Sequence, residues 1–138
     1  MKTLDNAATF RGRFLGLAFL VVVQFFIGII HVVVGFTMFV SGFTLAVFSD
    51  TPLIYSVYTL AYGCLTLLFA YLLWTGKPLG WTGTVGVSLF VIVADVLTVL
   101  GGLKFLGIPR LAAIGEVPFS LIILAYLLQI HVRSKYGV

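Results

Sequence analysis

Four long apolar segments dominate this sequence and restrict what it can fold into. Each is rich in Leu, Val, Ile and Phe, and they cover residues 14–40, 53–74, 81–102 and 117–132. A helix needs about 20 apolar residues to cross the hydrocarbon core of a bilayer. Because lipid offers no partner to backbone N–H and C=O groups, a spanning segment must bond them internally, as a helix does. The sequence therefore predicts an all-α integral membrane four-helix bundle, one transmembrane domain over residues 1–138.

The composition supports a lipid bilayer as the main solvent of the chain. Hydrophobic residues make up 62% of the 138 residues and charged residues 9%. A soluble domain carries about 25% charged residues, which this chain lacks. The net charge of +4 is modest, so we expect no nucleic-acid partner. The single cysteine, Cys64, excludes an intramolecular disulfide and a C-x-x-C redox motif.

The basic residues predict how the helices are oriented. The first apolar segment is far longer than the core of about 7–15 residues in a signal peptide, so we expect it to be a membrane span. With four spans, two of the eight basic residues lie on one side, and these are Lys104 and Arg110. The other six lie on the opposite side: Lys2, Arg11, Arg13, Lys77, Arg133 and Lys135. Because basic residues concentrate in cytoplasmic segments, both termini are predicted to be cytoplasmic, in the cell membrane.

The segment between the third and fourth spans carries basic residues among apolar ones. Residues 103–116 are therefore predicted to form an interfacial or re-entrant segment. Glu116 is expected at the outer interface near the start of the fourth helix, where the helix dipole favours an acidic side chain.

Small and polar residues recur along three of the segments at spacings of three and four. Residues at these spacings share one face of a helix. Membrane helices associate through small residues and interhelical hydrogen bonds. We therefore predict that five residues of these stripes lie at helix–helix contacts: Gln24, Gly28, Gly35, Gly63 and Ser88.

Asp95 lies on the polar stripe of the third segment and is expected to face protein. From a rise of about 1.5 Å per residue, Asp95, His31 and Tyr62 fall at a similar depth in the outer leaflet. An unpaired carboxylate there costs at least about 2.5–3.5 kcal/mol. We predict an intramembrane polar cluster in which Asp95 pairs with His31, with Tyr62 as a further donor. A bond that fixes helix register, a proton- or cation-handling site and a metal ligand are open roles for Asp95.

The motifs of several enzyme classes are absent. The sequence has no G-x-x-x-x-G-K-[ST], no H-E-x-x-H and no plausible Ser-His-Asp set. His31 and His131 are expected in opposite halves of the membrane, so one haem iron cannot take both within a chain. Tyr55, Tyr58 and Tyr62 form a row that indicates either packing or a quinone pocket. No catalytic residue, metal site or cofactor is predicted.

Two stretches resemble segments of small uncharacterised four-helix integral membrane proteins. YTLAYGCLTLLFAYLLWTGKPLGW resembles the turn between their second and third helices, and SLIILAYLLQIHVRSKYG resembles the tail after their last helix. The resemblance covers under half of the chain. It implies the four-helix architecture and no particular activity, and Asp95 and His31 lie outside it.

Three functions are compatible with these features. The small size and the absence of a catalytic set favour a non-catalytic accessory subunit of a membrane assembly, or a homo-oligomer. Its partners would be lipid and other membrane subunits or copies of itself. The alternative is an oligomeric proton- or cation-coupled transporter or channel, with Asp95 titrating and His31 as relay. A second alternative is a redox subunit that binds quinone or haem near the tyrosine row.

Overall fold

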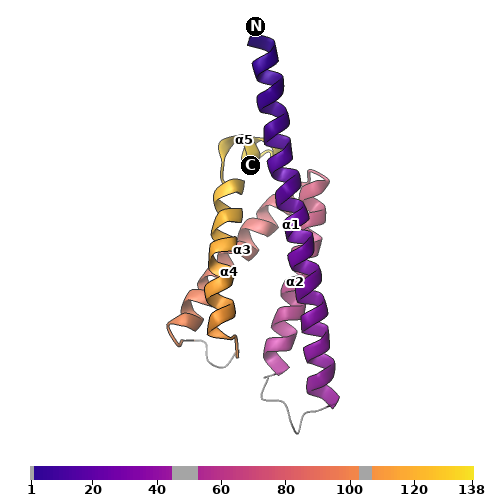
Figure 1. The fold of residues 1–138 in the computed structure, drawn as a ribbon, viewed down its shortest axis with the longest axis vertical. Helices are drawn as coiled ribbons and strands as arrows, with labels where there is room; N and C mark the ends of the chain where they lie inside the picture. The colour runs from indigo at the N-terminus through magenta and orange to yellow at the C-terminus, as the bar shows by residue number, and fades with distance from the viewer. Residues whose placement is uncertain (1, 45–52, 103–106) are drawn as a thin grey trace.

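The computed structural model describes residues 2–44, 53–102 and 107–138, with side chains described from residue 15 onward and, within α1, as far as residue 42. Every regular element in these ranges is helical, with no strand (Figure 1). The elements are α1 (Lys2–Thr44), α2 (Leu53–Trp74), α3 (Pro78–Val99), α4 (Arg110–Leu127), α5 (Ile130–Arg133) and a 3₁₀ turn, η2 (Ser134–Tyr136).

Four of these helices are long and apolar enough to cross a membrane. The apolar parts are Leu15–Gly42, Leu53–Trp74, Pro78–Val99 and Arg110–Leu127. The predicted all-helical architecture with four candidate spans is confirmed over the described residues. By the length and composition of these four helices, the chain is a multi-pass membrane protein.

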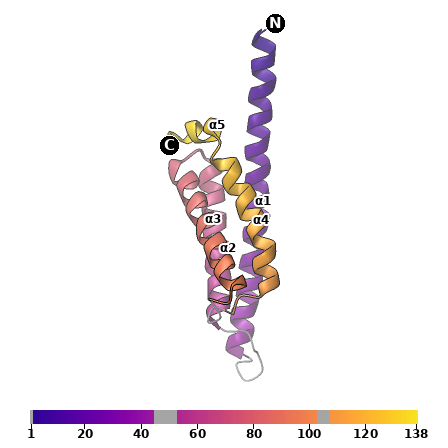
Figure 2. The ribbon, with the colours of Figure 1, turned by 90° about the vertical axis from the view of Figure 1, so that its left-hand side faces the viewer.

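Helix α1 is longer than a single crossing needs. Its 43 residues correspond to about 65 Å of helix, roughly twice the thickness of a hydrocarbon core. The N-terminal turns extend past the ends of the other helices in both views (Figures 1 and 2). The apolar part begins only at Leu15, so these first turns lie outside the candidate span.

The fourth span differs from the prediction at both ends. Residues 110–116, expected to be interfacial or re-entrant, form the first turns of α4, while residues 103–106 lie outside the described residues. Pro118 lies inside the helix, and a proline is tolerated in membrane helices because neighbouring groups satisfy the freed carbonyl. The helix instead ends at Leu127, and Gln129 is extended (φ −63°, ψ 136°), so residues 130–132 belong to a separate short helix.

Each long helix packs on the one before it, α1 with α2, α2 with α3 and α3 with α4. The turn between α2 and α3 is tight because Gly76 adopts a left-handed conformation (φ 74°). Its N–H bonds to the carbonyl of Leu73, and that of Lys77 bonds to the carbonyl of Leu72. The α5–η2 segment lies at this same end, toward which both termini point (Figures 1 and 2).

Glycines bring α1 and α2 into backbone contact. A Cβ atom on Gly63 would lie 2.7 Å from the backbone nitrogen of Val32 and 2.9 Å from the carbonyl oxygen of Gly28. One on Gly35 would lie 2.6 Å from the backbone nitrogen of Leu60. Such distances leave no room for any side chain, so the glycines hold these two helices together at close range. His31 lies between Gly28 and Gly35 on α1 and is therefore held close to α2.

Candidate intramembrane polar site

His31 uses both ring nitrogens. Its Nδ1 lies 2.8 Å from the carbonyl oxygen of Ile27, and its Nε2 lies 3.4 Å from Oε1 of Glu116. A carbonyl oxygen only accepts hydrogen bonds, so Nδ1 carries a proton and donates it. When His31 and Glu116 together carry no net charge, one proton remains to be shared between Nε2 and the Glu116 carboxyl group. That proton resides either on the imidazole, as an ion pair, or on the carboxyl group.

Tyr62, on α2, is the third residue of the group that His31 and Glu116 form. Its ring meets the imidazole of His31 edge to face, with centroids 4.8 Å apart and planes at 87°. The structure thus brings together two of the three residues predicted for the cluster, His31 and Tyr62, and adds Glu116. The sequence predicts Glu116 at the interface because it predicts a helix start at residue 117, whereas α4 begins at Arg110. Ser120, one turn further along the same helix, was the signal that this face of α4 is polar.

The structure has no hydrogen bond or ion pair between Asp95 and His31, the pairing that the sequence predicted. Asp95 is fully buried, with 0% exposure, but neither carboxyl oxygen has a hydrogen-bond partner among the described residues. His31 instead contacts Tyr62 on α2 and Glu116 on α4. Equal depth in the membrane therefore did not make Asp95 and His31 neighbours. Asp95 still lies within electrostatic reach of Glu116 and Tyr62.

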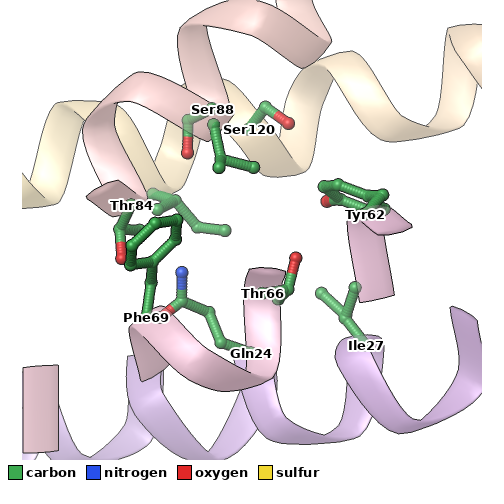
Figure 3. A pocket seen from close by; sticks show the side chains of 10 residues that line it. Gln24, Ile27, Tyr62, Thr66, Phe69, Thr84, Ser88 and Ser120 are labelled. Carbon is green, nitrogen blue, oxygen red and sulfur yellow. The ribbon is translucent and has the colours of Figure 1, made fainter. Parts of the chain in front are cut away.

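A cavity with polar side chains in its lining lies beside the His31–Glu116 pair, and all four long helices contribute to that lining (Figure 3). Gln24 and Thr66 point into it from one side and Ser88 from the other. The space open to the centre of a water molecule is about 20 Å³, enough for about one water. Its polar lining consists of Gln24, Tyr62, Thr66, Thr84, Ser88 and Ser120.

Tyr62 belongs to both the ionisable group and the cavity. Gln24 precedes His31 by about two helical turns, and Ser120 follows Glu116 by about one. Because α1 and α4 run in opposite directions, both offsets point toward the end where the termini lie (Figure 1). The cavity therefore lies between the ionisable group and that end of the bundle.

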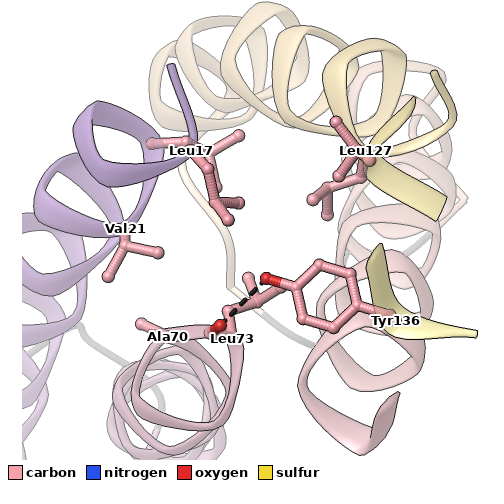
Figure 4. Close-up of a cluster of buried hydrophobic side chains, with 8 residues drawn as sticks. Leu17, Val21, Ala70, Leu73, Leu127 and Tyr136 are labelled. Atoms are coloured by element: carbon pink, nitrogen blue, oxygen red, sulfur yellow. Dashed lines mark hydrogen bonds between the residues drawn. The ribbon is translucent and has the colours of Figure 1, made fainter. Parts of the chain in front are cut away.

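An apolar cluster closes the bundle beyond the cavity (Figure 4). Tyr136 inserts into it from η2, and its hydroxyl donates to the carbonyl oxygen of Leu73 at 2.9 Å. The indole N–H of Trp81 donates to the carbonyl of Leu127 at 2.9 Å. Burial raises the pKa of Tyr136 to about 12, with the neighbouring Tyr126 adding to the effect. The buried members are Leu17, Leu20, Val21, Ala70, Leu73, Leu127, Val132 and Tyr136.

The five residues predicted for helix packing are all buried. Three of them, Gly28, Gly35 and Gly63, lie at the α1–α2 contact, and the other two, Gln24 and Ser88, line the cavity. In the described part of the chain no three His, Cys, Asp or Glu side chains come together as metal ligands would. Comparison of the chain with protein-family models, with curated proteins and with solved structures found no match.

Proposed function

We propose that this small multi-pass membrane protein binds and releases protons within the bilayer, as a proton-coupled transporter or channel. The observation that carries the proposal is Asp95, whose carboxyl group lies in a candidate span, is completely buried and has no hydrogen-bond partner within the described ranges of the chain. A carboxyl group kept only to fix helix register would be expected to be bonded, because nearly all buried polar groups are. Ionisable residues inside a membrane are costly and commonly mark proton or ion pathways.

The His31–Glu116 pair supports the same function. Since Nδ1 is committed to Ile27, the pair gains or loses a proton only on the Nε2 side, toward Glu116. The distance of 3.4 Å is longer than the 2.7–2.9 Å of a strong charge-assisted bond. A contact of this length binds a shared proton weakly, as a relay requires.

The proposal includes a second subunit. The cavity that the four helices line has room for about one water, which is too little for a path across the membrane. A second copy of the chain, or another membrane protein, would complete the path. The accessory-subunit role stays a prediction beside this proposal, and purification in mild detergent tests it, since a chain that always elutes alone and monomeric contradicts it.

The proposed orientation has both termini in the cytoplasm. The Thr75–Lys77 turn and α5–η2 lie at the end of the bundle that carries six of the eight basic residues. The His31–Glu116 pair then belongs to the outer half of the membrane, and the cavity lies further toward the cytoplasm.

The redox alternative stays a prediction as well. Both nitrogens of His31 are engaged, so haem ligation would require the contact with Glu116 to break. A purified protein without a Soret band in its absorbance spectrum would remove the haem version.

Proton flux into liposomes tests the proposal. The chain is reconstituted with a pH-sensitive dye inside the vesicles, and a potassium gradient with valinomycin sets the potential. We expect Asp95→Asn to lower the flux at least about tenfold, because the variant cannot exchange the proton. Asp5→Asn also removes one carboxyl group but lies before the apolar part of α1, and it should keep the parental flux. Equal flux in Asp95→Asn and the parent would exclude Asp95 from the mechanism.

A further inference from the structure

We infer that the polar cavity between the four helices is a binding site for water, and that this water carries protons away from the His31–Glu116 pair. The second part rests on the proposed function, whereas the first does not. The cavity, its unpartnered polar side chains and its contact with Tyr62 are the three observations behind the inference.

Three buried side chains of the lining have an atom without a hydrogen-bond partner among the described residues: Gln24, Thr66 and Thr84. Gln24 is 4% exposed and its Oε1 accepts no hydrogen bond, while Thr84 is 3% exposed and its Oγ1 forms none. Other threonines in these helices, such as Thr59 and Thr82, donate to the carbonyl four residues earlier. Leaving a buried polar group unbonded costs about 1–3 kcal/mol. A water in the cavity would satisfy Gln24 and Thr84.

The size and chemistry of the cavity select water over a metal cation. A volume of about 20 Å³ is close to the minimum that holds one water, which needs two to four polar partners. The lining supplies hydroxyl and amide groups from all four helices and contains no carboxylate. Divalent cations such as Ca²⁺ take six or more oxygen ligands, usually with carboxylates among them, which this lining does not provide.

Tyr62 connects the water to the ionisable group, because its ring contacts His31 and it also lines the cavity. In the proposed step the His31–Glu116 pair gives up one proton, and the Tyr62 hydroxyl takes it up as it gives its own proton to the water. The water then gives one of its protons to a carboxylate or a water molecule of the second subunit. Tyr62 and the water return to their starting states, the pair has lost one proton and the acceptor has gained one.

Hydroxyl-radical footprinting by X-ray radiolysis in nanodiscs tests the water site. Radicals form from bound water and modify adjacent side chains, so Phe69 and Tyr62 in the lining should be labelled. Phe26 and Phe90 are controls, since their exposed faces (65% and 59%) belong to apolar spans and meet lipid. We expect Phe69 to be labelled several-fold more than Phe26. Equal labelling of the two in the parent would overturn the inference.

Matched variants locate the water. Gln24→Leu combined with Thr84→Val keeps the side-chain shapes but removes two of the three unpartnered polar groups, and labelling of Phe69 should fall toward the level of Phe26. Thr82→Val removes an exposed threonine of the same helix and should leave the labelling unchanged. If Phe69 in the double variant is labelled as in the parent, the site is wrong. If the double variant does not fold, the labelling of Phe69 relative to Phe26 in the parent decides whether the cavity holds water.

The water site and the proposed proton-transfer function can be disproved independently of each other. Labelled Phe69 with no proton flux in the parent would retain the water site and remove the proposed function. Flux that depends on Asp95, with Phe69 unlabelled, would retain the function and overturn the water site.

Discussion

Nε2 of His31 lies 3.4 Å from Oε1 of Glu116, a residue 85 positions later in the chain. The contact joins α1 to α4, the first and last of the long helices. The two side chains are 20% and 30% exposed, which leaves them partly accessible from outside the bundle. A polar contact thus links helices that are far apart in sequence.

Replacing Glu116 should separate its role in stability from its role in proton transfer. Glu116→Gln keeps a donor for Nε2, so stability should change little while proton flux falls. Glu116→Leu leaves Nε2 unpaired and should lower the free energy of unfolding by about 1 kcal/mol. Thermal unfolding in detergent measures the stability. If the Leu variant unfolds at the parental temperature, the contact contributes nothing to the fold.

Replacing Asp95 with an apolar residue should stabilise the protein. Its carboxyl group is buried and no described residue bonds to it, so Asp95→Val removes an unsatisfied group and should raise the free energy of unfolding by about 1–3 kcal/mol. The same variant should lose proton flux. Denaturant titration checks the first effect. A clearly less stable Asp95→Val would mean that the carboxyl group is bonded in the membrane.

Glycine substitutions test the α1–α2 contact. A Cβ on Gly35 would lie 2.6 Å from the backbone nitrogen of Leu60, so Gly35→Ala should separate the helices and cost about 1–3 kcal/mol. Gly86 has nothing within 4 Å of a Cβ, and Gly86→Ala should be neutral or stabilising by up to about 1 kcal/mol. Equal unfolding temperatures for the two variants would contradict the close packing.

The C-terminal contact of Tyr136 should depend on pH. Its pKa is raised to about 12 because burial disfavours the tyrosinate, while the unfolded chain ionises near pH 10. The stability that this residue contributes is therefore complete below about pH 10 and is lost as the pH rises toward 12. The parent should be more stable than Tyr136→Phe at pH 8, by about 1 kcal/mol for the bond to Leu73. The difference should shrink by pH 11, and a constant difference would exclude this cause.

Single-cysteine labelling tests the orientation. In a Cys64→Ser background, Val138→Cys reports on the C-terminus and Gly102→Cys on the opposite end of the bundle. With both termini in the cytoplasm, an impermeant maleimide should label Gly102→Cys in intact cells and Val138→Cys only after lysis. The opposite pattern would invert the proposed topology.

The sequence was most informative where the physics is local. Apolar length predicted four helices, and the three-and-four spacing predicted buried positions such as Gly63, because both depend only on the geometry of one helix. Which helices become neighbours depends on packing across the whole bundle. Depth alone therefore predicted His31 next to Asp95, whereas the imidazole contacts Tyr62 and Glu116.

The boundary of the fourth helix shows a second limit. Gly115 and Pro118 are helix-breaking residues in water, so the sequence predicted a start at residue 117. In the structure the helix runs through both and begins at Arg110. Glu116 thereby moves from an interfacial position to one inside a span, facing His31.

The order in which the helices pack has a consequence for biogenesis. Each long helix rests on the one translated just before it, so the first hairpin is complete while the ribosome is still making α3. The contacts that join distant parts, His31 with Glu116 and Leu73 with Tyr136, must wait for the last third of the nascent chain. Until then the imidazole of His31 enters the translocon without Glu116, and a message truncated before Arg110 would release a chain in which His31 lacks this contact.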